Sequence, residues 1–179
     1  MQTLILAAAL VAAFTAPTVH AARFAVESLK EIREHAVVMQ RWETSCAAAS
    51  VATVLSYAYA DPVSERHVAG AMLAHTPAAR VRARGGFSLL DMKRFVEARG
   101  YAGAAYRHLS LDELKLFRAP IVPLRIHGRN HYVVVNAIDA NEVRIADPAF
   151  GNRVLPVARF AKVWREGLAF VIHPAGDAR

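Results

Sequence analysis

The sequence predicts a single α+β domain, with helices in the first part of the chain and a mainly antiparallel sheet in the last part. The chain has 179 residues, the usual size of one domain. Helix-capping signals recur before residue 120, and runs of β-forming residues follow it. Apolar residues make up 55% of the chain, which supplies a buried core and argues against a disordered or low-complexity protein.

The first 21 residues predict a signal peptide. Leu4–Phe14 is an unbroken apolar run, too short to span a bilayer, and Val19 and Ala21 occupy the two positions that signal peptidase reads. No Lys or Arg precedes the run, which departs from the usual pattern, and a buried N-terminal helix is the alternative. We expect cleavage after Ala21 and an exported protein, periplasmic or secreted. A lead-in segment (22–37), a folded domain (38–174) and a short tail (175–179) then follow.

Capping residues predict four helices in the first two thirds of the chain. Thr44 or Ser45 caps the first, whose alanine-rich body contains no Gly or Pro before Pro62. Asp61 and Pro62 predict the start of the second helix, which runs to about residue 73. Two capping-box pairs predict the others, Ser88 with Asp91 for a helix ended by Gly100, and Ser110 with Glu113 for a short helix to Phe117.

The last third predicts strands near 121–126, 131–138, 142–146 and 168–172, with a helix near 156–164. The run His-Tyr-Val-Val-Val from His131 consists of β-forming residues and is expected to be a central strand. A turn over 139–141 joins it to the next strand, which ends at Asp147 and Pro148. Antiparallel pairing brings the start of one strand beside the end of the other. We therefore expect His131 and Asp147 to be neighbours.

Basic side chains outnumber acidic ones by 22 to 15, which suits acidic substrates, nucleic acid or anionic lipid without choosing among them. The most basic stretch, 80–87, is expected to be a loop that is either solvated or in contact with an acidic peptide. It has no interleaved aromatic residues, and no Lys-Ser/Thr follows Gly85 and Gly86. We expect no nucleic-acid or nucleotide partner. His67 and His75 have no cluster of partners, so we expect no metal and no cofactor.

The single cysteine, Cys46, falls in the first turn of the first predicted helix. Unpaired backbone N–H groups and the positive end of the helix dipole stabilise a thiolate there. With one cysteine the chain cannot form an internal disulfide, so export favours a thiol that is either buried or useful. Two interpretations stay open at this point: a nucleophile, or a small buried side chain that opens a core helix.

A thiol nucleophile needs an imidazole to carry its proton and a third group to orient that imidazole. Among the eight histidines, only His131 has both a strand context and an expected partner, Asp147. An ordinary turn is the alternative interpretation of Asp147 and Pro148. The pattern indicates a candidate Cys46, His131 and Asp147 triad.

These residues together resemble the bacteriocin-processing double-glycine leader peptidases. The resemblance rests on Gln40 six residues before Cys46, on His-Tyr-Val-Val-Val from His131, and on Asp147-Pro148. It extends from about residue 38 to 171 and includes the segments Gly86–Lys93, Pro120–Leu124 and Phe160–Trp164. Family members are papain-like cysteine peptidases, usually the N-terminal domains of peptide-exporting ABC transporters. This chain is too short to contain the ATP-using module, so we expect an exported domain that stands alone.

The resemblance implies a role for each of four residues: Cys46 as nucleophile, His131 as general base and acid, Asp147 as the group that orients the imidazole, and Gln40 as oxyanion donor. The last role has independent physical support, because the Gln40 amide and the backbone N–H of Cys46 could converge on a developing oxyanion. The alternative for Gln40 is an ordinary surface residue. Ser45 stands where the family commonly has Asp, which bears on substrate specificity.

Three functions follow from these expectations. The first is a cysteine peptidase that cuts a peptide or protein after small residues such as Gly-Gly, with a membrane export or envelope assembly system as a candidate partner. The second is a papain-like hydrolase or acyltransferase acting on another amide. The third is a non-catalytic peptide-binding relative. The presence of all four site residues favours the two catalytic functions, since a binding module has no use for the full set.

Overall fold

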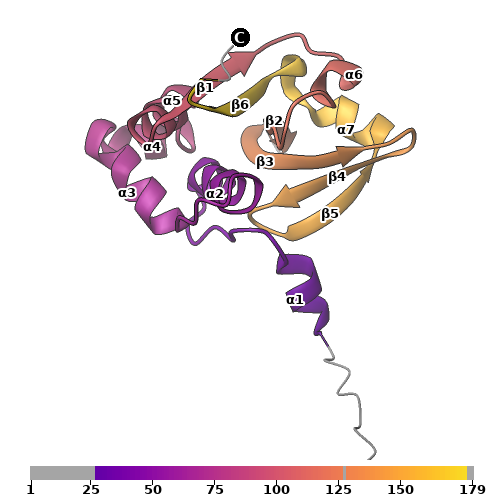
Figure 1. Cartoon of the computed structure of the whole chain (residues 1–179), viewed down its shortest axis with the longest axis horizontal. Helices are drawn as coiled ribbons and strands as arrows, with labels where there is room; N and C mark the ends of the chain where they lie inside the picture. The colour runs from indigo at the N-terminus through magenta and orange to yellow at the C-terminus, as the bar shows by residue number, and fades with distance from the viewer. Residues whose placement is uncertain (1–26, 127, 177–179) are drawn as a thin grey trace, which may run out of the picture.

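The computed structural model describes residues 27–126 and 128–176 and confirms the α+β fold class (Figure 1). Within these residues one antiparallel sheet has the strand order β1-β6-β2-β3-β4-β5. The strands are β1 (Tyr101–Tyr106), β2 (Ile121–Ile126), β3 (Arg129–Ile138), β4 (Glu142–Asp147), β5 (Gly151–Pro156) and β6 (Ala169–Pro174). The helices are α1 (Leu29–Glu34), α2 (Cys46–Thr53), α3 (Glu65–His75), α4 (Ala78–Arg84), α5 (Leu89–Ala98), α6 (Leu111–Leu114) and α7 (Val157–Val163), with a π-helical turn η1 (Val54–Ala58) and a 3₁₀ turn η2 (Arg165–Gly167).

The predicted signal peptide lies outside the described residues, as do the first part of the lead-in segment and the end of the tail. In the part of the chain that is described, no helix has the length and apolar character needed to cross a bilayer.

Both faces of the sheet are buried, which explains the uninterrupted apolar run in β3. Tyr132 and Val134 point to one face and pack in a core with α2, α3 and α5. Val133 and Val135 point to the other face and pack in a second core with α7. Figure 1 shows α2 and α3 on one side of the strands and α7 on the other. The central strands are therefore held in place from both sides, and the ends of β3 and β4 are fixed with them.

Helix α2 begins at Cys46, with Ser45 in the capping position as predicted. The Ser45 hydroxyl does not cap the helix, because it donates to the Trp42 carbonyl (2.8 Å) and accepts from the Trp42 N–H (3.2 Å). Every residue of α2 is buried, and its small side chains let it lie close against β3. There the Ser50 hydroxyl donates to the Tyr132 carbonyl (3.1 Å). Helix α2 is thus fixed directly against the strand that carries His131.

Two predictions in the helical part are wrong. Asp61 and Pro62 do not start a helix: Ser64 caps α3, and the Asp61 carboxylate instead accepts from Arg99 Nε (2.6 Å) and from its Nη2 in a two-pronged ion pair. The stretch 80–87 is not a loop, since α4 occupies it as far as residue 84. Alanine and arginine are good helix formers, and Gly85 ends α4 in the left-handed region (φ +78°).

Other predicted elements are confirmed. The capping boxes of Ser88 with Asp91 and of Ser110 with Glu113 are both present, although α6 ends at residue 114. The four predicted strands and the helix near 156–164 correspond to β2, β3, β4, β6 and α7. The predicted elements did not include α1, β1 or β5. Strand β1 pairs with β6 along its whole length, and β5 pairs with β4 in the same way.

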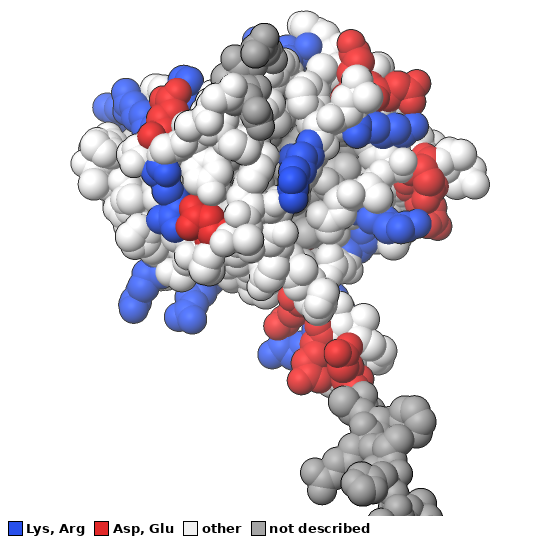
Figure 2. Space-filling view, in the orientation of Figure 1, with Lys and Arg blue, Asp and Glu red and all other residues white. Residues whose placement is uncertain are grey.

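Residues 28–40, here called the N-terminal arm, are attached to β5 and to the turn before it. A capping box of Ser28 and Glu31 starts α1. Gly151 (φ +78°) lies so close to the arm that a Cβ there would be 2.5 Å from the Arg33 carbonyl oxygen. Asn152 Nδ2 donates to the His35 carbonyl (2.7 Å). Figure 2 shows acidic side chains gathered on α1, well separated from the helices α3 and α4.

Candidate active site

Cys46 lies at the start of α2 and lines a cleft of about 650 Å³. Its side chain is 4% exposed and also packs in the core beneath α2. Cys46 therefore borders the cleft, as expected for a nucleophile, and also packs in the core, as expected for a small buried side chain. The cleft also contains His131 and Gln40, so the structure brings three of the four predicted site residues to one place.

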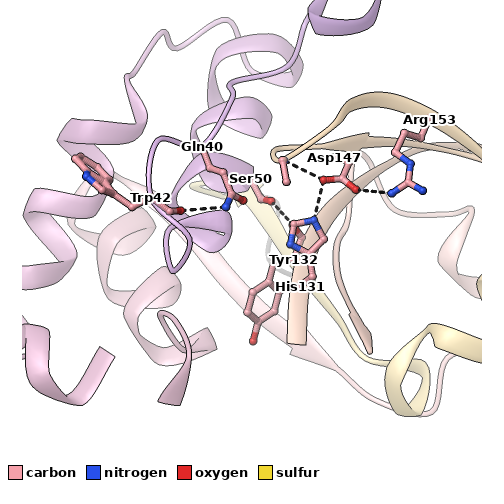
Figure 3. Close-up of polar contacts among 8 residues, drawn as sticks. Gln40, Trp42, Ser50, His131, Tyr132, Asp147 and Arg153 are labelled. Carbon is pink, nitrogen blue, oxygen red and sulfur yellow. Dashed lines mark hydrogen bonds and ion pairs between the residues drawn. The ribbon is translucent and has the colours of Figure 1, made fainter. Parts of the chain in front are cut away.

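His131 and Asp147 are in contact, as the predicted pairing of their strands requires. The His131 Nε2 lies 2.7 Å from Asp147 Oδ1 (Figure 3). The register of β3 and β4 pairs Val134 with Ala146, which places the start of β3 beside the end of β4. Asp147 lies behind the imidazole, away from the cleft, and its side chain is fully buried. Since Nε2 is occupied by the carboxylate, Nδ1 is the ring nitrogen left to interact with Cys46, which lines the same cleft as His131.

The Asp147 carboxylate is held on both oxygens. Oδ1 also accepts from the Ala149 N–H (2.9 Å), and Oδ2 accepts from Arg153 Nη1 (3.0 Å). Burial by itself raises the pKa of a carboxyl group, but the hydrogen bonds and charge of His131, with the donors on Ala149 and Arg153, hold the pKa of Asp147 below its ordinary value. The carboxylate is therefore ionised and fixed in direction, as an imidazole-orienting group requires.

The protonated form of His131 is strongly favoured. Burial opposes protonation, but hydrogen bonds to Asp147 and Cys46, together with the charges of both partners, raise the pKa of His131 from 6.5 to about 9. An imidazolium between a carboxylate and a thiolate is the arrangement that activates a sulfur nucleophile and supplies a proton to a leaving amine. The site can carry out acyl transfer from an amide.

Gln40 lies in the segment before α2, with its side chain lining the cleft. Its Nε2 donates to the Trp42 carbonyl (3.0 Å), as Figure 3 shows, and its backbone N–H donates to the Pro148 carbonyl (2.8 Å). The Oε1 atom is buried and has no hydrogen-bond partner among the residues that the structure describes. One of the two side-chain N–H groups of Gln40 thus holds the side chain in place, and the other does not take part in that hydrogen bond.

Arg153 and the Ala149 N–H are parts of the site that the sequence did not reveal. Arg153 reaches Asp147 because β5 pairs with β4 in a register that places Arg153 opposite Ile145, diagonally across from Asp147. β5 itself was not predicted, so no sequence signal pointed to this contact. His67 and His75 are exposed on α3, and residues 27–126 and 128–176 contain no group of three His, Cys, Asp or Glu arranged to hold a metal ion.

The fold and the site define a class of protein, the papain-like thiol hydrolases, in which a cysteine at a helix start faces a strand-borne histidine. A model of the Peptidase C39 family matches residues 34–177. The chain is 38% identical over 155 residues to the probable functional amyloid protease FapD of Pseudomonas aeruginosa, and 38% identical over 148 residues to FapD of Pseudomonas fluorescens. These alignments cover 86% and 82% of this chain, and 67% and 64% of the two relatives.

Solved structures agree with this relationship. A double-glycine-motif protease from an AMS/PCAT transporter, crystallised with a leader peptide, superimposes with a TM-score of 0.63 at 26% identity, covering 77% of this chain and 90% of that one. The peptidase domain of Streptococcus ComA gives 0.65 at 22% identity, covering 77% and 97%, and shows the same fold. This chain belongs to the Peptidase C39 family and is a cysteine peptidase with the papain-like fold.

Proposed function

We propose that the protein cleaves a peptide bond through a thioester on Cys46, with His131, Asp147 and Gln40 in the roles that the sequence suggested. The Cys46 thiolate attacks the carbonyl carbon, and Nδ1 of His131 gives its proton to the leaving amine. Water then attacks the thioester, His131 takes a proton from that water, and the acid product leaves with regeneration of the thiol. The observation that carries the proposal is the 2.7 Å contact of Asp147 with Nε2, which directs Nδ1 toward the cleft thiol.

Cleavage after small residues such as Gly-Gly is supported by the space next to the thiol. A second, small cavity of about 140 Å³ is lined by Cys46, Arg84, Gly85, Gly86 and neighbouring side chains. Gly86 has φ +151° and lies against the Thr44 carbonyl, with a Cβ position only 3.2 Å from that oxygen. The backbone at Gly86 thus lies close to the segment that precedes Cys46, and a small cavity at the thiol suits a small substrate residue beside the scissile bond. The leader peptide bound to the double-glycine-motif protease supports a peptide as the substrate class.

An exported location and a membrane export or envelope assembly system as partner are supported by two findings. The relatives carry the name functional amyloid protease, and the first 21 residues have the pattern of a signal peptide. N-terminal sequencing of the protein from fractionated cells tests the location. We expect the mature chain to begin at Ala22 in the periplasmic or secreted fraction, and recovery of a chain that starts at Met1 from the cytoplasm would contradict it.

Replacement of Cys46 by alanine tests the activity. Fluorogenic peptides with a central Gly-Gly are incubated with the protein and with Cys46→Ala, and we expect the rate to fall by about 10⁴–10⁶-fold, as for loss of a triad nucleophile. A thiol-directed covalent probe should label Cys46 in the same preparation. The matched control is His67→Ala, which alters an exposed imidazole on α3 outside the cleft. Comparable hydrolysis by Cys46→Ala, with circular dichroism showing an intact fold, would refute the assignment.

A further inference from the structure

Three arginines line the cleft that holds Cys46. Arg82 and Arg84 come from α4 on one wall, and Arg129 comes from the start of β3, two residues before His131. Glu43 supplies the one carboxylate among the described residues that line this cleft. The electrostatic potential in the cleft is therefore positive. The low-dielectric walls of a cleft strengthen this field, which attracts negatively charged ligands.

Two of these arginines already have carboxylate partners. Arg84 Nη2 lies 3.0 Å from Asp91 Oδ2, and Asp91 is a buried residue that also caps α5. Arg129 Nη1 lies 2.7 Å from Glu43 Oε1, and both side chains of that pair are well exposed. In contrast, Arg82 is exposed and makes no ion pair with any carboxylate in the described part of the chain. Arg82 is thus the guanidinium of the cleft that is available to a ligand.

The position of Arg82 places it on the path of a bound chain. Besides the cleft, Arg82 lines an adjoining groove of about 380 Å³ whose other walls include Trp42, Leu73, Val81 and Phe87. Because the same side chain borders both spaces, it lies on the ridge between the apolar groove and the thiol. A peptide that extended from Cys46 into the apolar groove would therefore pass this guanidinium.

We propose that Arg82 selects substrates with an acidic side chain near the scissile bond, and that Arg129 adds a weaker attraction of the same sign. The proposal rests on the peptidase function proposed above and narrows its substrate class to peptides that carry Glu or Asp in the segment crossing α4. A guanidinium fork matches a carboxylate in a two-pronged hydrogen bond that an amide side chain cannot reproduce with the same charge. The contact is solvent-accessible, so it discriminates by about two- to fivefold at low salt.

The test is a binding measurement that does not depend on catalysis. Fluorescein-labelled dodecapeptides built on alanine, with one leucine and a central Gly-Gly, carry either Glu or Gln at each position in turn. Their affinities for Cys46→Ala protein are measured by fluorescence anisotropy in 50 mM and 500 mM NaCl, a comparison that separates screened from unscreened contacts. We expect Glu at one or two positions to bind about two- to fivefold tighter than Gln in the low-salt buffer, and the difference to shrink at high salt.

The matched variants locate the effect. Adding Arg82→Gln should abolish the preference for Glu, Arg129→Gln should reduce it, and Arg80→Gln should leave it intact, since Arg80 is an exposed arginine of the same helix that lines neither space. Equal affinities for Glu and Gln peptides, whether both measurable or both too weak to measure, would overturn the inference, as would a preference that survives Arg82→Gln. Incubation of the same peptides with protein that retains Cys46 tests the proposed function separately, by the appearance of cleavage products.

Discussion

Arg153 donates to the Asp147 oxygen that His131 leaves free, at 3.0 Å on Oδ2 against 2.7 Å for His131 on Oδ1. A fully buried carboxylate is thus held between two cationic side chains, the imidazolium of His131 and the guanidinium of Arg153 on β5. Arg153 also stacks over the ring of Phe150, whose side chain lines the cleft. Figure 3 shows the row from Arg153 through Asp147 to His131. Arg153 is a positioning residue in our proposal, because it acts on the imidazole through Asp147.

Replacing Arg153 by methionine should change the pH profile as well as the rate. Loss of this cation leaves the Asp147 charge less compensated, so the pKa of His131 rises and the alkaline limb of activity moves to higher pH. The rate should fall by about tenfold, the size of one charge-assisted hydrogen bond of about 1.5 kcal/mol. Arg153→Lys should retain most of the rate and keep the alkaline limb near its original pH. Arg144→Met is the control, since Arg144 of β4 pairs with Asp139, an exposed residue of the turn between β3 and β4. A lower rate with an unmoved alkaline limb would show a purely structural role.

Asp147→Asn should shift the alkaline limb in the opposite direction. An amide supplies no negative charge to the imidazolium, so the pKa of His131 falls, and the tautomer that presents Nδ1 as a base is no longer enforced. We expect kcat to drop by about 10⁴-fold. The measurement is a pH–rate series from pH 5 to 10, with a thermal melt to verify that the variant folds. An activity within tenfold of the unmodified protein would remove Asp147 from the mechanism.

Gln40→Ala should lower kcat by about 10²–10³-fold with little change in KM, since an oxyanion donor acts in the transition state and not on the bound substrate. Gln40→Glu is a useful companion, because it keeps the size of the side chain and replaces the N–H donors by oxygen. Steady-state kinetics on one Gly-Gly peptide separates the two parameters. If KM rises while kcat is retained in both variants, Gln40 contacts the ground-state substrate and is not an oxyanion donor.

The elevated pKa of His131 also predicts a pH-dependent stability. The folded-state pKa of about 9 lies above the ordinary 6.5, so folding binds a proton between these values. This contribution is fully present below pH 6.5 and is lost as the pH rises through 9. Urea unfolding at pH 6 and pH 10 should show a loss of free energy, on the order of 1–3 kcal/mol, that is absent in His131→Gln. Equal pH dependence in both proteins would mean that His131 is not held as an imidazolium.

The candidate site was more predictable from sequence than its surroundings. Cys46 lies at a helix start, and His131 and Asp147 lie at strand ends, so local signals placed each of them before any packing was known. The strands carrying His131 and Asp147 are joined by a short turn, and a short connection leaves little freedom in their pairing. Arg153 had no such signal, because its contact depends on the register of β5 against β4.

The missed elements are those whose stability comes from neighbours. β1 has the sequence Tyr-Ala-Gly-Ala-Ala-Tyr, with no β-branched residue, yet it forms an edge strand along β6. Its glycine, Gly103, allows the Phe170 ring to pack where a Cβ would lie 2.8 Å from Cζ. Asp61 does not cap a helix, because its carboxylate forms an ion pair with Arg99, which is distant in sequence. Local pattern cannot anticipate contacts of this kind, since the tertiary partner decides the outcome.

The attachment of the N-terminal arm also determines how the molecule would respond to mechanical load. Tension applied at the start of the arm would pass first through the packing of Arg33 on Gly151 and then through the hydrogen bond of Asn152 to His35. Both contacts lie on the part of β5 that pairs with the end of β4. Val37, which is buried in the core around α2, lies further along the arm. A pull on this end of the chain would therefore reach the strand beside the candidate site before it disturbed that core, so that activity would be lost at a lower force than the fold.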